Sequence, residues 1–152
     1  PVLSDAVYQA AVGTGATVHK GGTYVVMEGP LFSTRAESNL YRSWGASVIG
    51  MTALPEAKLA REAEMCYATI ACSTDYDCWH EGHDDVTVEM IIANLLKNVD
   101  ASKQIVRKVA GNLPANRTCG CGSALANAII TDRSLIPEEA KERLGLLIGK
   151  YL

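Results

Sequence analysis

The sequence predicts an α/β fold in which a mixed, mostly parallel sheet is flanked by helices. Two observations support this class. Short apolar runs rich in β-branched residues alternate with segments whose apolar residues recur at helical spacing, and glycine or proline separates most of these segments. Alternating strands and helices are typical of parallel sheets with helical crossovers. A chain of 152 residues, 48% apolar and 20% charged, is also long enough for one domain with its own core.

Helix starts and stops follow capping residues. Asp5 can cap a first helix that Gly13 ends. In the second helix Leu40 and Trp44 lie at helical spacing and Gly45 follows them. Helices are expected over about 5–11, 34–44, 55–64 and 86–113, and from 137 onward.

The strands are the apolar runs between these helices. Two β-rich runs separated by Gly21 and Gly22 predict a hairpin or tight turn, and Gly29-Pro30 breaks the second run. The run CYATIAC, apolar on both faces, predicts a buried strand. Strands are expected over 16–20, 23–28, 47–51 and 66–72.

Charge and hydropathy argue against several classes of partner. The net charge is −3, and the 14 basic residues form no stripe that would attract nucleic acid or anionic lipid. Apolar stretches fall far short of the ~18 residues of a membrane-spanning helix. An N-terminal signal segment is not evident. The expectation is a cytoplasmic protein that binds neither nucleic acid nor membrane.

The five cysteines do not form the even set typical of a secreted disulfide framework. Cys66, Cys72 and Cys78 fit small buried apolar residues. Cys119 and Cys121 lie in the glycine-rich turn RTCGCGSA, where a disulfide between them is a hypothesis.

A metal site is the alternative use of these cysteines. Cys78, His80 and His83 could combine with the CGC pair to bind zinc. Neither spacing is a strong zinc signature, so we predict no metal and treat the histidines as solvated.

Three loops follow predicted strands: GPLFST, MTALPE and STDYDCW. Ligands of α/β sheets bind beyond the carboxyl ends of strands. The third loop carries Asp75 and Asp77, which fit either a polar turn or a pair of acids that bind and protonate a substrate.

A resemblance favours the second interpretation. The motifs EGPLFSTRAES (28–38), GMTALPE (50–56) and YATIACSTDYDCW (67–79) occur in the order and near the spacing of trimeric purine nucleoside phosphorylases. More narrowly, they resemble the 5′-methylthioadenosine phosphorylase branch of that family. The resemblance is close from Gly21 to Lys97 and weaker elsewhere.

The resemblance implies a reaction. Inorganic phosphate, a co-substrate, attacks C1′ of a purine nucleoside, and the free purine leaves; no cofactor is implied. Asp75 matches the residue that donates a hydrogen bond to N7 as negative charge builds on the purine, so it must carry a proton. Asp77 matches the carboxylate that accepts from the 6-amino group and rejects a 6-oxo group. Thr74 belongs to the same substrate-binding motif.

Relatives that cleave inosine and guanosine carry asparagine at the position of Asp75 and glutamate at that of Ser33, so this pair implies a 6-aminopurine. Gly50 departs from an asparagine of some methylthioadenosine phosphorylases.

Other roles are implied by motif. Phe32 resembles a wall of the base pocket, Met51 a sugar contact, and Thr52 a phosphate contact. Val88 and Ile91 resemble the lining for the 5′-methylthio group. For Phe32, Met51, Val88 and Ile91 the alternative is core packing, and for Thr52 it is a cap at the end of a strand.

The family also has a glycine-rich phosphate loop and further phosphate ligands in an N-terminal half that does not occur in this sequence. We therefore expect residues 1–152 to be the C-terminal part of a single phosphorylase domain. Its expected partners are the N-terminal half of the same subunit and further copies in a homotrimer or homohexamer. The alternatives are a phosphorylase for inosine, guanosine or methylthioinosine, and a non-catalytic nucleoside-binding fragment.

Overall fold

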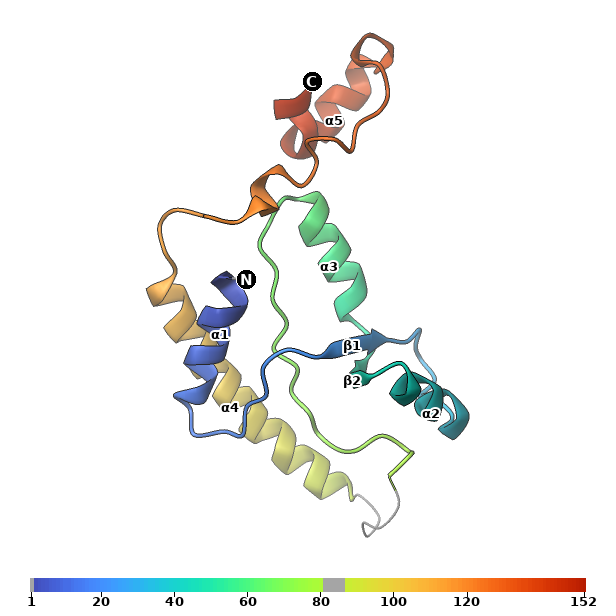
Figure 1. The fold of residues 1–152 in the computed structure, drawn as a ribbon, viewed down its shortest axis with the longest axis vertical. Coiled ribbons are helices and arrows are strands. Elements are labelled where there is room, and N and C mark those ends of the chain that lie inside the picture. The colour runs from blue at the N-terminus through green and yellow to red at the C-terminus, as the bar shows by residue number, and fades with distance from the viewer. Residues whose placement is uncertain (1, 81–86) are drawn as a thin grey trace.

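Two parallel strands lie among five α-helices in the computed structural model, which describes residues 2–80 and 87–152 (Figure 1). The predicted α/β class is confirmed. The α-helices are α1 (Val2–Val12), α2 (Arg35–Ser43), α3 (Ala53–Glu62), α4 (Val88–Asn112) and α5 (Glu138–Ile148), and the strands are β1 (Thr23–Val26) and β2 (Ala46–Gly50). Short 3₁₀ turns η1 (Gly120–Ser123), η2 (Arg133–Leu135) and η3 (Gly149–Tyr151) follow α4 and surround α5.

A βαβ unit forms the centre of the structure. β1 pairs with β2 in parallel, with Tyr24 opposite Val48 and Val26 opposite Gly50. The connecting helix α2 begins at a capping box: the Thr34 hydroxyl accepts from Glu37 N, and the Glu37 carboxylate accepts from Thr34 N at 2.7 Å. This cap fixes the point where the loop after β1 becomes α2.

The predicted hairpin is wrong. Residues 16–20 form no strand, and β1 pairs with β2 instead. Gly21 and Gly22 have φ angles of +80° and +113°, which turn the chain and bring its backbone close to β2. A Cβ on Gly22 would lie 2.7 Å from Ser47 Oγ, so only glycine allows this approach.

The predicted strand over 66–72 is also wrong, although its backbone is extended. No strand within the described residues pairs with it, and a strand is defined by such pairing. Its side chains still alternate: Cys66, Ala68 and Ile70 are partly buried, whereas Tyr67 and Thr69 are exposed. The segment 65–74 therefore keeps the pleat of a strand without its hydrogen bonds.

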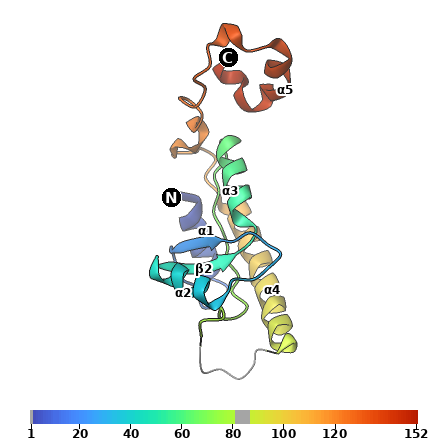
Figure 2. The ribbon, with the colours of Figure 1, turned by 90° about the vertical axis from the view of Figure 1, so that its right-hand side faces the viewer.

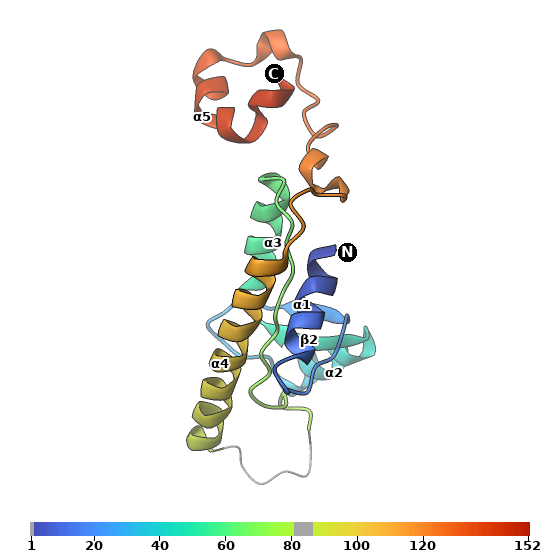
Figure 3. The same ribbon diagram turned by 90° about the vertical axis from the view of Figure 1, so that its left-hand side faces the viewer.

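Helix α1 packs along one side of the long helix α4, as Figures 1 and 3 show. Ala11 of α1 and Ile105 of α4 are both buried, and Lys108 Nζ donates to Gly13 O at 2.9 Å. The 25 residues of α4 match the long amphipathic helix predicted from the sequence. Figure 2 shows the C-terminal segment with α5 beyond the end of α3.

The described chain buries little apolar surface, contrary to the expected core. Only Ala11, Ala53 and Ile105 are buried apolar residues within 2–80 and 87–152, whereas Phe32 and Leu31 are about four-fifths exposed. Contiguous exposed apolar side chains usually mark a surface that another protein segment covers. None of the helices in these ranges is long and apolar enough to cross a membrane.

Candidate active site

The loops that follow β1, β2 and the extended segment 65–74 lie close together, as expected for the carboxyl ends of neighbouring parallel strands. Ser33 follows β1 and Asp77 follows the extended segment. The Ser33 hydroxyl donates to the Asp77 carboxylate at 3.3 Å, although the two residues are 44 positions apart. The Cys78 thiol lies 3.5 Å from Ser33 O and joins the same two loops. The structure thus places two predicted substrate-binding residues in direct contact.

The environment of Asp77 favours its ionised form. Partial burial alone would raise the pKa of its carboxyl group. The buried Ser38 hydroxyl, on the first turns of α2, and the Cys78 N–H, which donates at 2.9 Å, outweigh burial and hold this pKa below its ordinary value, with a further contribution from Ser33. Within the described residues Ser38 Oγ has no partner at normal hydrogen-bond geometry, so the hydrogen bonds seen at Asp77 come from Cys78 and Ser33.

Helix α4 positions the backbone next to Asp75, the first acid of the pair. The Thr74 hydroxyl donates to Asp75 Oδ2 at 2.7 Å. Asn94 Nδ2 donates to Thr74 O at 3.0 Å, and Asn98 Nδ2 donates to Ser73 O at 2.9 Å. The two asparagines lie one turn apart on one face of α4. This helix therefore fixes the backbone that carries Asp75, whose side chain is exposed.

Aromatic side chains support the other end of the loop. Tyr76 stacks on His80 with ring centroids 4.5 Å apart, and Trp79 packs edge-on against Tyr76. The Arg42 guanidinium of α2 lies 3.4 Å from the centre of the Trp79 ring. The loop 73–80 is thus held by α2 on one side and by α4 on the other.

The loop after β2 supplies Met51 and Thr52. Met51 Sδ would lie 3.2 Å from a Cβ on Gly29, so this side chain packs against the backbone of the loop after β1. Thr52 is the N-cap residue of α3, but its side chain makes no capping hydrogen bond in the described structure and is exposed. Thr52 thus occupies the N-cap position of α3 without a side-chain capping bond, and its role stays a prediction. Thr52 also lines a groove of about 330 Å³ between the start of α3 and residues 67–72.

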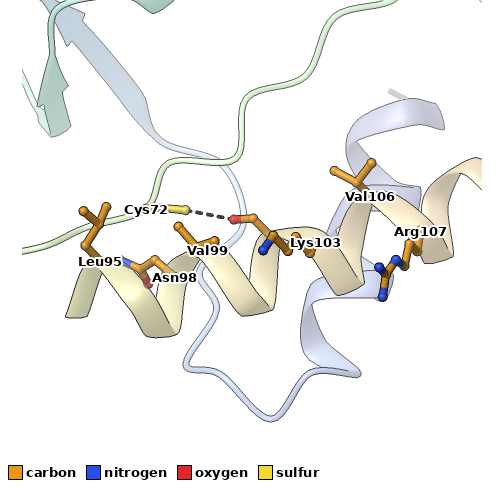
Figure 4. Close-up of a pocket in the computed structure, with 8 residues that line it drawn as sticks. Cys72, Leu95, Asn98, Val99, Lys103, Val106 and Arg107 are labelled. Atoms are coloured by element: carbon orange, nitrogen blue, oxygen red, sulfur yellow. Dashed lines mark hydrogen bonds between the residues drawn. The ribbon is translucent and has the colours of Figure 1, made fainter. Parts of the chain in front are cut away.

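A second groove, of about 470 Å³, runs along α4 beside the extended segment (Figure 4). Cys72 Sγ lies 3.2 Å from Ser102 Oγ at its centre. Leu95, Val99 and Val106 form its apolar floor. Asn98, which donates to Ser73 O, also lines this groove, so the groove adjoins the loop that carries the two acids. Its floor is part of the exposed apolar face of α4.

Residues 1–110 match the family model described as the phosphorylase superfamily. The chain belongs to this superfamily. It is 63% identical over 150 residues to S-methyl-5′-thioadenosine phosphorylase of Geobacter sulfurreducens, covering 99% of this chain and 52% of that relative. The family expected from the three motifs is confirmed.

Solved structures agree with this phosphorylase assignment. A methylthioadenosine phosphorylase from an antarctic soil metagenomic library superimposes with a TM-score of 0.82 at 40% identity, covering 95% of this chain and 52% of that one. Methylthioadenosine phosphorylase from Schistosoma mansoni in complex with adenine superimposes with a TM-score of 0.70 at 28% identity, covering 88% and 53%. The chain spans about half the length of the curated relatives it matches.

The remaining predicted site residues lie in the loop after β1, which carries Phe32, and at the start of α4, which carries Val88 and Ile91. Phe32 is 82% exposed, so it does not pack in a core within the described residues. Ile91 is partly buried one turn before Asn94, on the face of α4 that holds the loop, whereas Val88 is 66% exposed. The roles assigned to these residues stay predictions.

Sequence reasoning missed Asn94, Asn98 and Ser38. Two asparagines at an interval of four residues beside an apolar helix face were the available signal for the first two. Ser38 is the last residue of the motif EGPLFSTRAES and gave no comparable signal. Gly50 lies against the Tyr24 side chain: a Cβ at position 50 would lie 2.1 Å from the Tyr24 hydroxyl, so one of the two residues would have to move.

The cysteines group differently from expectation. All five lie in the described residues and are free thiols; the disulfide between Cys119 and Cys121 stays a prediction. The Cys78 thiol contacts Ser33 O, at the loop 73–80 that carries Asp75 and Asp77. His83, a residue of the alternative zinc set, lies outside the described residues. Cys66, not Cys78, approaches the CGC pair.

Proposed function

We propose that this chain supplies the purine subsite and part of the sugar subsite of an enzyme that cleaves 5′-methylthioadenosine with phosphate. The products are adenine and 5-methylthioribose 1-phosphate. The observation that carries the proposal is the pair of acids, Asp75 and Asp77, held by different partners on one loop. The relatives named methylthioadenosine phosphorylase, and the adenine complex of one of them, support it.

The two acids differ in what they can do. Asp77 is favoured in its ionised form, because hydrogen bonds lower its pKa. An ionised carboxylate accepts from the 6-amino group of adenine and repels a 6-oxo group. Ser33 adds a hydroxyl to this carboxylate and leaves space where a longer acidic side chain would collide with it.

Asp75 is the catalytic residue of the proposal. As phosphate forms a bond to C1′ and the C1′–N9 bond breaks, the electron pair of that bond passes to the purine. A protonated Asp75 carboxyl donates to N7 and stabilises the charge mainly in the transition state. Thr74 and Asn94 set the position of this group, since a small displacement weakens such a contact.

The other subsites follow the loop positions. Thr52 lies at the start of α3, and its side chain makes no capping hydrogen bond in the described structure. It contacts phosphate, and the backbone N–H groups of this turn add to that contact. Met51 contacts the sugar, Phe32 covers the base, and Val88 and Ile91 contact the methylthio group. The working enzyme has no cofactor, requires the N-terminal half of the subunit, and assembles as a homotrimer or homohexamer. A cytoplasmic location is part of the same proposal.

The decisive experiment measures adenine release from 5′-methylthioadenosine by the complete subunit, with and without phosphate, with inosine assayed in parallel. Release that requires phosphate and spares inosine is expected. Release without phosphate dependence, or a preference for inosine, would contradict the proposal. The 152-residue chain alone should bind phosphate poorly and turn over little.

Variants then assign the acids. Asp75→Asn should depress activity on 5′-methylthioadenosine far more than any residual activity on 6-oxopurines. Asp132→Asn is the matched control, because that carboxylate accepts from Ser134 at the start of η2 and lies outside the proposed site. Equal losses in the two variants would remove Asp75 from the mechanism.

A further inference from the structure

Three thiols converge where the extended segment leaves α3. Cys66 follows the end of α3, and Cys119 and Cys121 lie at the start of η1. The three Sγ atoms lie within 4.8 Å of one another, and those of Cys66 and Cys119 are 3.3 Å apart. All three residues are partly buried. Figure 1 shows η1 beside the end of α3, although 53 residues separate Cys66 from Cys119.

Contacts other than sulfur hold these two segments together. Arg117 Nη1 donates to Glu64 O at 2.8 Å, and Leu125 N donates to Glu64 Oε1 at 3.0 Å. Lys150 pairs with the Glu64 carboxylate and donates to Gly122 O at 2.6 Å. These contacts surround the thiols on both sides in sequence, so their convergence does not depend on a bond between sulfur atoms.

The thiols are electronically unequal. Hydrogen bonds from the Cys121 backbone and the Cys66 thiol lower the pKa of Cys119 to about 7. The neighbouring Cys119 sulfur raises the pKa of Cys121. A bound cation would displace thiol protons, because only thiolates coordinate metal ions.

We propose that Cys66, Cys119 and Cys121 form a three-thiolate site for a thiophilic metal ion such as Zn²⁺ or Cu⁺. Zinc–sulfur bonds of about 2.3 Å place the sulfur atoms of a tetrahedral site about 3.8 Å apart. The three Sγ atoms here lie within 4.8 Å of one another, so small side-chain movements would bring them to that spacing. A disulfide joins only two sulfurs at about 2.05 Å and leaves the third thiol unused. Sulfur ligands select soft ions, and a water molecule completes the coordination of zinc.

The bound ion would fasten the start of the segment 65–74 to the C-terminal part of the chain. This role is independent of purine binding, because the acids lie at the other end of that segment. It differs from the zinc set considered from the sequence, since Cys66 replaces Cys78 and the histidines.

The test titrates Cd²⁺, a zinc substitute, into the reduced protein under anaerobic conditions and follows the ultraviolet absorption of sulfur-to-cadmium charge transfer. One equivalent per chain is expected, and Zn²⁺ should displace it. Cys66→Ser and Cys119→Ser should each weaken binding by at least the 10- to 100-fold that loss of an outer-shell partner costs. Cys72→Ser is the matched control and should bind normally, because Cys72 lies on the groove of α4.

Circular dichroism of each variant shows that a lost signal does not reflect unfolding. A second measurement compares the unreduced and reduced intact masses of the protein as purified, with its bound metal quantified. A stoichiometric metal that is lost with Cys66→Ser supports the site. No charge-transfer band in the reduced protein, equal binding in Cys66→Ser and Cys72→Ser, or a native disulfide between any two of the three cysteines overturns it.

Discussion

Replacing Gly50 with alanine should destabilise the protein, because the Tyr24 ring occupies the space of a side chain at that position. The new Cβ would lie 2.1 Å from Tyr24 Oη and 2.9 Å from Tyr24 Cζ. Ordinary contact begins at 3.4 Å, so the ring or the strand must move by more than 1 Å. The two residues are on paired strands, where Tyr24 lies opposite Val48 and Gly50 lies opposite Val26.

The sign of the change in unfolding free energy shows whether a clash is present, because Gly→Ala without a clash usually stabilises. Gly50 has no left-handed φ, so alanine fits its backbone. Without a clash, Gly→Ala at a compatible site stabilises by about 0.4–1 kcal/mol through the unfolded state. Overpacking costs about 1–3 kcal/mol, so the expected net effect is a loss of about 1–2 kcal/mol.

Urea unfolding, monitored by circular dichroism, measures the change in unfolding free energy caused by Gly50→Ala. The substitution is made once in the natural sequence and once in the Tyr24→Ala variant. In Tyr24→Ala the clash is absent, so the same substitution should become neutral or stabilising. Gly145→Ala is the matched control: its Cβ meets nothing within 4 Å in the described structure, and it lies inside α5. It should stabilise by up to about 1 kcal/mol.

Two results would refute the reasoning. One is an equal cost of Gly50→Ala in both backgrounds, which would mean that Tyr24 and Gly50 are not coupled. The other is stabilisation of the natural background, which would mean that the ring does not occupy this space.

Three further predictions concern the site and its support. Asn94→Ala removes the hydrogen bond to Thr74 O, which contributes about 1 kcal/mol, so adenine should bind roughly fivefold more weakly in calorimetry. Asn112→Ala is the control, because the Asn112 amide donates to Lys108 O of its own helix. An equal loss in that variant would argue against a role for Asn94. Ser33→Ala should raise the pKa of Asp77 toward its ordinary value, which a carbon-13 NMR titration can follow; an unchanged titration would mean that the hydroxyl does not favour the ionised form. Burial would raise the pKa of Glu64, but hydrogen bonds from Lys150, Tyr151 and the Leu125 N–H lower it from 4.5 to about 2. Because the folded pKa is the lower one, Glu64 should stabilise the fold above about pH 4.5 and lose this effect as pH falls toward about 2. Glu64→Gln should flatten the pH dependence of unfolding in that window, and a profile equal to that of the natural chain would contradict the assignment.

Much of the site could be predicted because its residues are local in sequence. Asp75, Thr74 and Asp77 occupy one short motif, and Ser33 precedes a capping box that is itself a sequence pattern. The helices were predicted well for the same reason, since periodicity and caps act within a few residues. The expected cap at Asp5 was wrong, because α1 begins at Val2 and Asp5 lies in its first turn.

The errors have a different origin. The pairing of β1 with β2 rather than with residues 16–20 depends on contacts between segments that are far apart in the chain. The extended run 66–72 has the composition of a buried strand, but composition does not supply a neighbouring strand. The core expected from chain length is small because the apolar faces have few partners among the described residues.

The sequence by itself determined the α/β class, the family and the pair of acids, because these depend on local patterns and motifs. Only the tertiary structure decided that α4 positions Asp75 through Asn94, that the Tyr24 ring lies against Gly50, and that Cys66 joins the CGC pair. Each of these joins residues more than 15 positions apart. Such distances are set by how whole elements pack, and local propensity carries no information about them.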